Sequence, residues 1–339
     1  MGNSVGSSIS TRYDLGWGHS VCVRQAFLSA HGGSPLILSE DDLIKYNYPE
    51  HEGDKEVIAL TRQIIRRQLG LEYKHIVLTN GATGGVMISL RAFSQLGYEA
   101  CETRVPPFYI RYPGMIKASG LKQTHQRTTL NEPRYPGEKV YLLDLPSNPI
   151  GYTDDPFVQV DGPLVLDGVY YNNVYTKGYI KPVPHDVFVG SYSKLLGLNG
   201  IRIGWIATDD DLLYDQLKEL VTSEYCGLSM SDSILLKHLL RGFDWDVFEA
   251  LARTHLNRNR EEWSRLERYF EGRPVSDVGM FYYAKMDSSC KALMEKAGIK
   301  WTPGSLMGTD DSYGRFNLGQ DCNLTKKVVK EVLKKDGLL

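Results

Sequence analysis

Apolar residues along the chain follow two patterns, one typical of helices and one typical of buried strands. Between positions 55 and 70 they recur every three or four residues, which predicts an amphipathic helix that ends at Gly70. Short continuous apolar runs predict strands at 75–79, 140–144, 163–166, 187–189 and 201–207. Further strands are expected at 279–284 and 313–318, and further helices at 21–30, 86–93, 209–220, 229–241 and 246–270, with a Lys-rich helix closing the chain. At 339 residues, the pattern describes one large α/β unit or two domains.

Composition argues against several classes of protein. With 39 Lys and Arg against 41 Asp and Glu, the net charge is −2, so no nucleic-acid partner is expected. The longest apolar runs have strand length, so no membrane span is expected, and residues 1–10 lack the features of a signal peptide. The five cysteines are scattered and odd in number, which is typical of reduced cysteines in a cytoplasmic protein and matches no metal-site spacing.

A glycine-rich segment, Asn80-Gly-Ala-Thr-Gly-Gly85, joins the strand at 75–79 to the helix at 86–93. A turn of this kind presents free backbone N–H groups at the positive end of a helix, where a phosphate group is a natural ligand. Glycine-rich turns join many strands to helices, so the segment indicates a phosphate site only in combination with other motifs.

One later stretch combines a lysine, two serines and an arginine. Lys194 follows a predicted strand together with Ser191 and Ser193, and Arg202 comes eight residues later, after two glycines. A lysine amine can form a Schiff base with a carbonyl, while a guanidinium and hydroxyl groups can bind a phosphate. Pyridoxal 5'-phosphate (PLP) offers both groups. The alternative is a basic surface turn, but the apolar run at 201–207 indicates that the segment lies against the core.

The pattern Ser-x-Ser-Lys followed by Gly-x-Arg-x-Gly-Trp, at 191–205, resembles the cofactor-lysine segment of class I and II PLP-dependent aminotransferases, which have fold type I. The resemblance runs through seven motifs, from about residue 48 to 315. It implies that Lys194 holds PLP as a Schiff base and moves a proton as general base and acid. It also implies the fold, an α/β large domain at 31–222 with a mostly parallel mixed sheet flanked by helices. A smaller α+β domain is expected at 1–30 and 223–339.

The same resemblance assigns cofactor contacts. Asp167 stands at the carboxyl end of a predicted strand, where α/β sheets place functional groups, and would pair with the pyridine nitrogen. Tyr109 would stack on the ring, and Asn148 and Tyr170 would hydrogen-bond to the 3'-oxygen. The phosphate would be held by Ala82, Thr83, Ser191, Ser193 and Arg202.

Substrate contacts and the oligomeric state are implied as well. Arg315 resembles the arginine that binds the substrate α-carboxylate through a bidentate fork, although a lone strand arginine is more often a surface residue. Asn148 and the loop at Gly16 and Trp17 are expected beside the substrate. Tyr48, which precedes a proline and a helix, resembles the tyrosine that reaches the cofactor phosphate of the partner subunit. A homodimer with a shared active site is therefore expected.

The predicted activity is transfer of an amino group between an amino acid and a 2-oxo acid by a ping-pong mechanism. A PLP-dependent decarboxylase or other lyase on the same scaffold is the alternative. A non-enzymatic PLP sensor would need a DNA-binding module before this domain, and only about forty residues precede Tyr48. One departure from the family is the short stretch between Asn148 and Asp167, where we expect a turn or extended link in place of a crossover helix.

Overall fold

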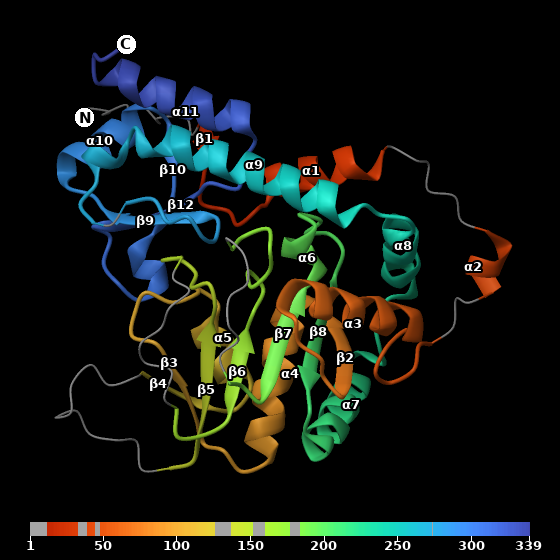
Figure 1. Cartoon of the computed structure of the whole chain (residues 1–339). Helices are drawn as coiled ribbons and strands as arrows, with labels where there is room; N and C mark the ends of the chain where they lie inside the picture. Colours follow the sequence, from red (N-terminus) through yellow and green to blue (C-terminus); the bar gives the residue numbers. More distant parts are fainter. Residues whose placement is uncertain are drawn as a thin grey trace, which may run out of the picture.

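The computed structural model describes residues 12–32, 39–44, 48–125, 137–151, 160–176, 184–272 and 274–339. Its centre is a seven-stranded sheet with the strand order β2-β8-β7-β6-β5-β3-β4 (Figure 1). The strands are β2 (His75–Asn80), β3 (Ala100–Thr103), β4 (Lys122–His125), β5 (Lys139–Asp144), β6 (Leu164–Asp167), β7 (Val187–Ser191) and β8 (Ile203–Thr208). The strands from β3 to β7 are parallel, and β8 runs antiparallel to its neighbours β7 and β2. The expected mostly parallel mixed sheet is confirmed.

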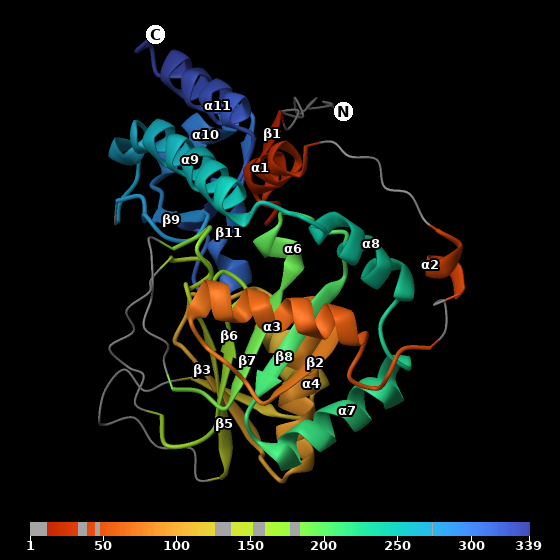
Figure 2. The ribbon, with the colours of Figure 1, turned by 45° about the vertical axis from the view of Figure 1, so that its right-hand side comes forward.

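Helices cover both faces of this sheet (Figure 2). One face carries α4 (Gly81–Gln95), α5 (Tyr112–Ala118) and α7 (Asp211–Tyr225), and the other carries α3 (Lys55–Leu69) and α8 (Met230–Leu240). Successive residues of one strand pack into opposite cores: Leu142 lies in the core with α4, and Leu143 in the core with α3. Because both faces are buried, the strands read as continuous apolar runs in the sequence.

A second group of elements has its own core around Trp263. It contains an antiparallel sheet of β9 (Phe281–Lys285), β11 (Thr302–Pro303) and β12 (Tyr313–Asn317), in the order β11-β12-β9. β1 (Tyr13–Asp14) pairs in parallel with β10 (Ile299–Lys300), so segments far apart in sequence lie side by side. The associated helices are α9 (Trp245–Ser264), α10 (Ser288–Lys296) and α11 (Cys322–Lys335). α1 (Val21–His31) packs along α9, and its buried residues belong to the core that contains α3. The division into domains at 31–222 and at 1–30 with 223–339 stays a prediction.

Several elements differ from the sequence-based expectation. The glycine-rich segment forms the first turn of a helix and not a turn before it, because α4 begins at Gly81. Gly81 itself has a φ of +66°, a conformation that favours glycine. The helix expected over 246–270 ends at Ser264 and is followed by the short 3₁₀ helix η1 (Glu267–Tyr269). A second 3₁₀ helix, η2 (Gly304–Met307), lies between β11 and β12. The other short helices are α2 (Glu40–Ile44) and α6 (Tyr192–Leu195).

The link between Asn148 and Asp167 is described only at its two ends. Residues 145–151 and 160–163 form bends and turns, and residues 152–159 lie outside the described residues, so the absence of a crossover helix stays a prediction. Within the described chain no helix combines the length and apolarity needed to cross a membrane. All five cysteines are free.

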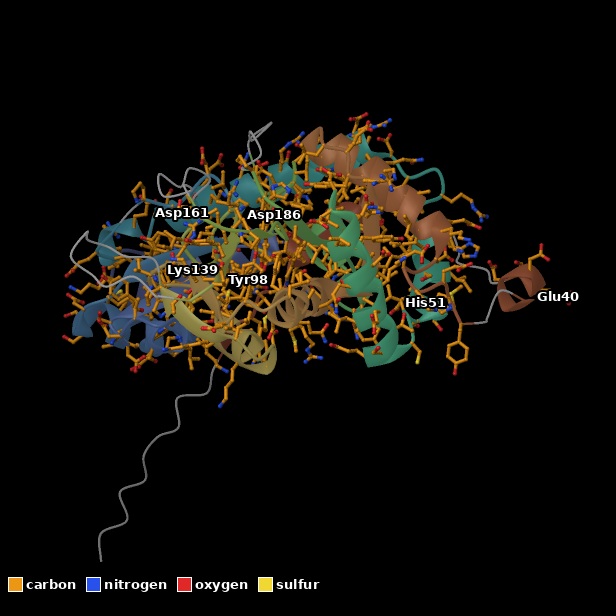
Figure 3. All side chains as sticks on the ribbon, turned by 90° about the horizontal axis from the view of Figure 1, so that it is seen from below. Glu40, His51, Tyr98, Lys139, Asp161 and Asp186 are labelled. Atoms are coloured by element: carbon orange, nitrogen blue, oxygen red, sulfur yellow. The ribbon has the colours of Figure 1, made fainter. Side chains whose placement is uncertain are left out.

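The direction of the parallel strands indicates where a ligand would bind. Figure 3 looks at the end of the sheet where these strands begin; Lys139, Asp161 and Asp186 lie there, at or just before the starts of β5, β6 and β7. Ligands of α/β sheets bind at the opposite, carboxyl end. That end faces the group of elements that contains β9 and β12 (Figure 1).

Candidate active site

A cavity of about 490 Å³ lies at the carboxyl ends of β5, β6 and β7, whose last residues Asp144, Asp167 and Ser191 line it. All but one of the residues predicted to contact cofactor or substrate line this cavity: Gly16, Trp17, Ala82, Thr83, Tyr109, Asn148, Asp167, Tyr170, Ser191, Ser193, Lys194, Arg202 and Arg315. The exception is Tyr48, which is 88% exposed and lines a separate hollow beside α3 and α8. Within one chain, Tyr48 therefore does not join the site.

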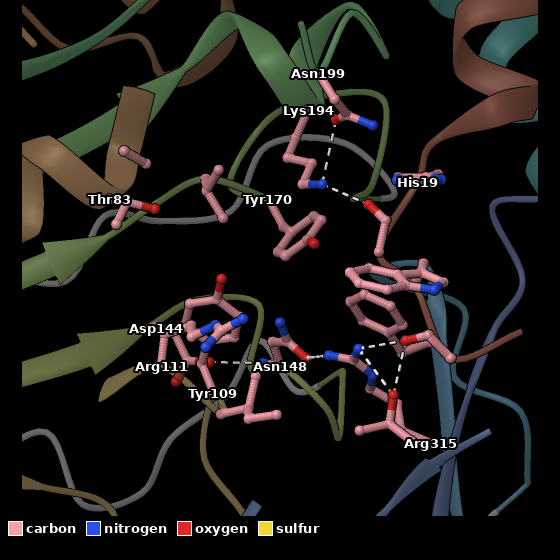
Figure 4. Close-up of a pocket in the computed structure, with 18 of the residues that line it drawn as sticks. His19, Thr83, Tyr109, Arg111, Asp144, Asn148, Tyr170, Lys194, Asn199 and Arg315 are labelled. Atoms are coloured by element: carbon pink, nitrogen blue, oxygen red, sulfur yellow. Dashed lines mark hydrogen bonds between the residues drawn. The ribbon is translucent and has the colours of Figure 1, made fainter. Parts of the chain in front are cut away.

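Lys194 projects from α6 into the cavity (Figure 4). The Ser191 side chain caps this short helix by accepting a hydrogen bond from Ser193 N at 3.1 Å. The Lys194 amine donates to the Gly18 carbonyl and to Asn199 Oδ1, the latter at 3.3 Å. Burial, and then the nearby guanidinium groups of Arg315 and Arg202, lower the pKa of this amine to about 8.

Arg202 and the start of α4 form a second part of the cavity wall. Arg202 Nη1 donates to Ser193 Oγ and to the Asn199 carbonyl, both at 2.9 Å. A side chain at Gly81 would overlap the Arg202 guanidinium, so the first turn of α4 can approach the arginine only with glycine there. The backbone N–H groups of a helix start and a guanidinium thus face one space, which suits a phosphate group.

Asp167 is a buried carboxylate without a cationic partner among the described residues. It accepts hydrogen bonds from the Tyr112 hydroxyl at 2.9 Å and from Val169 N at 3.2 Å. Asp144 lies opposite it on the adjacent strand β5. Burial, and then the negative charge of Asp144, raise the pKa of Asp167 to about 7. A ligand that supplies a positive charge would relieve this arrangement.

Arg315 lies on β12, on the other side of the cavity, and is also buried. Its Nη1 donates to Asn148 Oδ1 at 2.9 Å, and its Nη2 donates to the Gly16 carbonyl at 2.9 Å and to Thr302 Oγ1 at 3.2 Å. Its Nε has no hydrogen-bond partner in the described part of the chain. The guanidinium carbon stands 4.2 Å from the centre of the Phe281 ring. Burial lowers the pKa of Arg315, and all of its partners are neutral, so a carboxylate would meet no competing anion.

Sequence reasoning missed some of the residues that complete this site. Tyr112, which bonds to Asp167, lies three positions after Tyr109 in the same aromatic segment, and the two rings meet edge to face at 5.4 Å. Asn199 lies inside the segment that carries Lys194, but nothing in the sequence predicted that its amide would contact the lysine amine. Nothing in the sequence around Thr302 indicated a contact with Arg315.

The residues around the cavity fit PLP. Asp167, buried and without a cationic partner in the described part of the chain, matches a protonated ring nitrogen. The close approach of Gly81 to Arg202 leaves a cradle that suits a phosphate. Lys194 lies in the same cavity, with a lowered amine pKa. The described residues contain no cluster of His, Cys, Asp or Glu that could hold a metal ion.

Comparison with known proteins gives the same family. The family model described as aminotransferase class I and II matches residues 46–335. The chain is 27% identical over 144 residues to tryptophan aminotransferase-related protein 2 of Arabidopsis thaliana, covering 40% of this chain and 31% of the relative. It is 26% identical over 190 residues to histidinol-phosphate aminotransferase of Cronobacter sakazakii, covering 50% and 51%. These matches span about a third to a half of the length of those relatives.

Solved structures are similar over nearly the whole chain. The aromatic aminotransferase of Pyrococcus horikoshii superposes with a TM-score of 0.75 at 16% identity, covering 96% of this chain and 97% of that chain. The aspartate aminotransferase of Rhizobium meliloti gives a TM-score of 0.74 at 18% identity, covering 96% and 92%. At such low identity these likenesses establish the fold. The extent of the family match goes further: the chain belongs to the class I and II aminotransferases, a family that uses PLP as its cofactor.

Proposed function

We propose that this protein is a PLP-dependent aminotransferase that moves an amino group between an amino acid and a 2-oxo acid. The observation that carries the proposal is the common cavity of three ionisable groups, namely the Lys194 amine, the Asp167 carboxylate and the Arg315 guanidinium. When bound, PLP supplies a carbonyl that combines with amines and an electron-accepting ring. Each of the three groups suits a different part of that chemistry.

The cofactor would be held by groups at or after the carboxyl ends of β2, β3, β5, β6 and β7. Asp167 would face the ring nitrogen and Tyr109 would pack on the ring, while Asn148 and Tyr170 would reach the ring oxygen. Lys194 would bind the carbonyl carbon covalently. The phosphate would lie between the start of α4 and the segment 191–202, which is called the lysine turn below. The residues near it would be Ala82, Thr83, Ser191, Ser193 and Arg202.

Lys194 can hold or release a proton near neutral pH. Its lowered pKa leaves a useful fraction of neutral amine, which can take a proton from a bound substrate and return it. Arg315 can hold a carboxylate throughout the reaction, because its planar fork meets only neutral oxygens in the cavity. Since amino acid and 2-oxo acid would use the same cavity in turn, we expect ping-pong kinetics.

Retention of the carboxylate distinguishes this proposal from a decarboxylase on the same fold. A buried guanidinium that grips the α-carboxylate orients the substrate so that the Cα–H bond, not the Cα–carboxylate bond, is exposed to the base. Arg315 therefore favours amino-group transfer.

The mouth of the cavity favours an amino acid with a large apolar side chain. Trp17 is 60% exposed and Leu306 is 53% exposed, and both line the cavity together with Trp301. Exposed apolar side chains at a concave site are covered when an apolar ligand group binds. One similar protein is named as tryptophan aminotransferase-related, which agrees with this preference.

A homodimer with a shared site is part of the proposal. Tyr48 is exposed beside a hollow that Met230 and Lys237 help to line, so it is free to meet a second chain. In such a dimer Tyr48 would reach the phosphate in the partner's cavity. We also propose a cytoplasmic location, which agrees with five free cysteines.

Borohydride reduction followed by peptide mapping tests the central assignment. Reduction should fix PLP to the peptide that contains Lys194 and not to Lys300, the other lysine that lines the cavity. The variant Lys300→Ala should still be labelled at Lys194, while Lys194→Ala should not be labelled. Labelling at Lys300, or none in the wild type, would contradict the proposal.

Product analysis tests the reaction. With a panel of amino acids and a 2-oxo acid acceptor, mass spectrometry should detect the matching 2-oxo acid, fastest for amino acids with large apolar side chains. Carbon dioxide and an amine as the main products would show a decarboxylase. A preference for small or acidic donors would contradict the substrate class.

A further inference from the structure

The Lys194 amine is held on two sides by oxygen atoms that carry no charge. One is the backbone carbonyl of Gly18, and the other is Asn199 Oδ1 at 3.3 Å (Figure 4). Gly18 lies in the loop between β1 and α1, residues 15–20, which is called the N-terminal loop below. Asn199 lies five residues after the lysine, in the turn between α6 and β8. Lys194 forms no ion pair with a carboxylate among the described residues.

The turn that carries Asn199 is fixed at several points. The Asn199 carbonyl accepts a hydrogen bond from Arg202 Nη1 at 2.9 Å, and the same nitrogen donates to Ser193 Oγ at 2.9 Å. Gly197, with φ of +69°, packs so closely on the backbone of α1 that a side chain there would overlap Arg24. The Asn199 amide therefore stands on a rigid support beside the amine.

The Gly18 carbonyl is fixed from the other side. Asn317, on β12, donates from Nδ2 to the carbonyls of Trp17 at 2.6 Å and His19 at 2.8 Å. Its own Oδ1 accepts from Gly319 N at 2.7 Å, so the buried amide is satisfied at both ends. This clamp holds the two residues that flank Gly18, so the carbonyl between them stays directed at Lys194.

We propose that Asn199 is a positioning residue for Lys194, whose amide oxygen acts with the Gly18 carbonyl to hold the amine over the cavity without a negative charge. The proposal rests on the proposed function in that it concerns the lysine expected to bind PLP. It adds a role to a residue outside the predicted set of contacts.

The absence of charge at position 199 matters because of the other groups around the amine. Other ionisable groups line the cavity from different elements. Arg202 comes from the same turn, Arg315 from β12 and His19 from the N-terminal loop. Asp167 ends β6, and Tyr170 lies in the segment after it. The two arginines add to burial in lowering the amine pKa to about 8. A carboxylate in place of the Asn199 amide would oppose them, raise the pKa of the amine and reduce its neutral fraction near pH 8.

The test measures the Lys194 amine directly, in the full chain freed of cofactor. A trace of acetic anhydride is added at a series of pH values, and mass spectrometry measures the acetylated fraction of the Lys194 peptide. We expect a midpoint near pH 8 for the wild type. Asn199→Asp should raise it by about one pH unit or more, the effect of an opposite charge within about 4–6 Å. Asn199→Ala should lower it, because the ammonium loses an acceptor, and Asn199→Gln should restore part of the difference.

Asn257→Asp provides the control, because this asparagine is exposed on α9 and does not line the cavity. It should leave the midpoint unchanged. The same midpoint in Asn199→Asp, Asn199→Ala and the wild type would overturn the proposal, and so would equal shifts in Asn199→Asp and Asn257→Asp. If Asn199→Asp does not fold, as judged by circular dichroism, the midpoint of Asn199→Ala decides the question.

A second measurement follows PLP capture by the cofactor-free chain at pH 8, recorded as the appearance of its absorbance band. Asn199→Ala should slow capture several-fold relative to the wild type even at saturating PLP, since the amine is no longer held in place. An unchanged rate would count against positioning. The midpoints can shift as predicted while borohydride traps nothing at Lys194; the positioning role would then stand and the proposed function would fail. If borohydride traps PLP at Lys194 but the acetylation midpoints do not shift, the proposed function would stand and the positioning role of Asn199 would fail.

Discussion

Replacing Asp167 by asparagine removes a buried carboxylate for which the described residues of the cofactor-free protein offer no cationic partner. The Asp167 carboxylate is buried between β5 and β7, and its hydrogen-bond donors are the Tyr112 hydroxyl and Val169 N. Neither donor carries a charge, and the neighbouring Asp144 adds a repulsion. Asparagine has nearly the same shape and can still accept the hydrogen bond from Tyr112. The substitution therefore isolates the electrostatic part of the interaction.

The size and sign of the effect follow from the pKa of Asp167, which is raised from 3.8 to about 7 in the folded chain. The folded state then binds more protons than the unfolded state, so the free energy of unfolding falls as pH rises from about 4 to about 7. At about 1.4 kcal/mol per pH unit, the full loss is ~4 kcal/mol. About 2 to 3 kcal/mol of it falls between pH 5 and pH 8.

Urea unfolding of the cofactor-free chain at pH 5 and pH 8 measures this difference. Relative to the wild type, Asp167→Asn should gain about 2 to 3 kcal/mol between the two pH values, because it lacks the ionising group. Asp161→Asn changes an exposed carboxylate just before the same strand and should follow the wild type. Added PLP should stabilise the wild type at pH 8 more than Asp167→Asn. Parallel pH dependence of wild type and Asp167→Asn would refute the reasoning.

Three further predictions concern the arginine, the subunit contact and the glycine cradle. Arg315→Lys should weaken binding of amino and 2-oxo acids by about 2 to 4 kcal/mol, since lysine lacks the planar fork; unchanged affinity in substrate titrations would place the carboxylate clamp elsewhere. If Tyr48→Phe and Lys194→Ala are each strongly impaired, mixing them should recover activity through hybrid dimers, whereas a fully active monomer in sedimentation would exclude a shared site. Gly81→Ala should lower PLP affinity through overlap with the neighbouring guanidinium and should cost about 1–3 kcal/mol of backbone strain. Gly32→Ala, with a similar φ of +70° but open space around it, should show only the strain in thermal melting.

The sequence predicted those elements whose side chains meet a core on a regular period. α3 is the clearest case: Asp54 caps its start by accepting from Val57 N, and Gly70 ends it with a φ of +66°. β4 was missed because it is an edge strand with the polar sequence Lys-Gln-Thr-His, which carries no apolar signal. β3 was missed as well, since it is only four residues long and half polar.

For the site, motifs predicted which side chains meet but not how they are supported. Lys194 and Arg202 could be placed together because one short segment carries both. The pairing of Tyr112 with Asp167 depends on the point where α5 begins, and no local pattern sets that point. The contact of Arg315 with Thr302 depends on the register of β11 on β12, which only the folded chain reveals.

The clamp between β12 and the N-terminal loop has a consequence for the order in which the protein is made. The hydrogen bond from Arg315 to the Gly16 carbonyl joins positions 299 residues apart, and those from Asn317 span 300 and 298 residues. A growing chain on the ribosome can assemble the central sheet and the lysine turn long before β12 emerges. Until then the residues on either side of Gly18 lack the hydrogen bonds from Asn317, so the Gly18 carbonyl is not held toward Lys194. A nascent chain released before β12 should therefore carry a lysine turn that captures cofactor poorly, so that binding of PLP reports completion of synthesis.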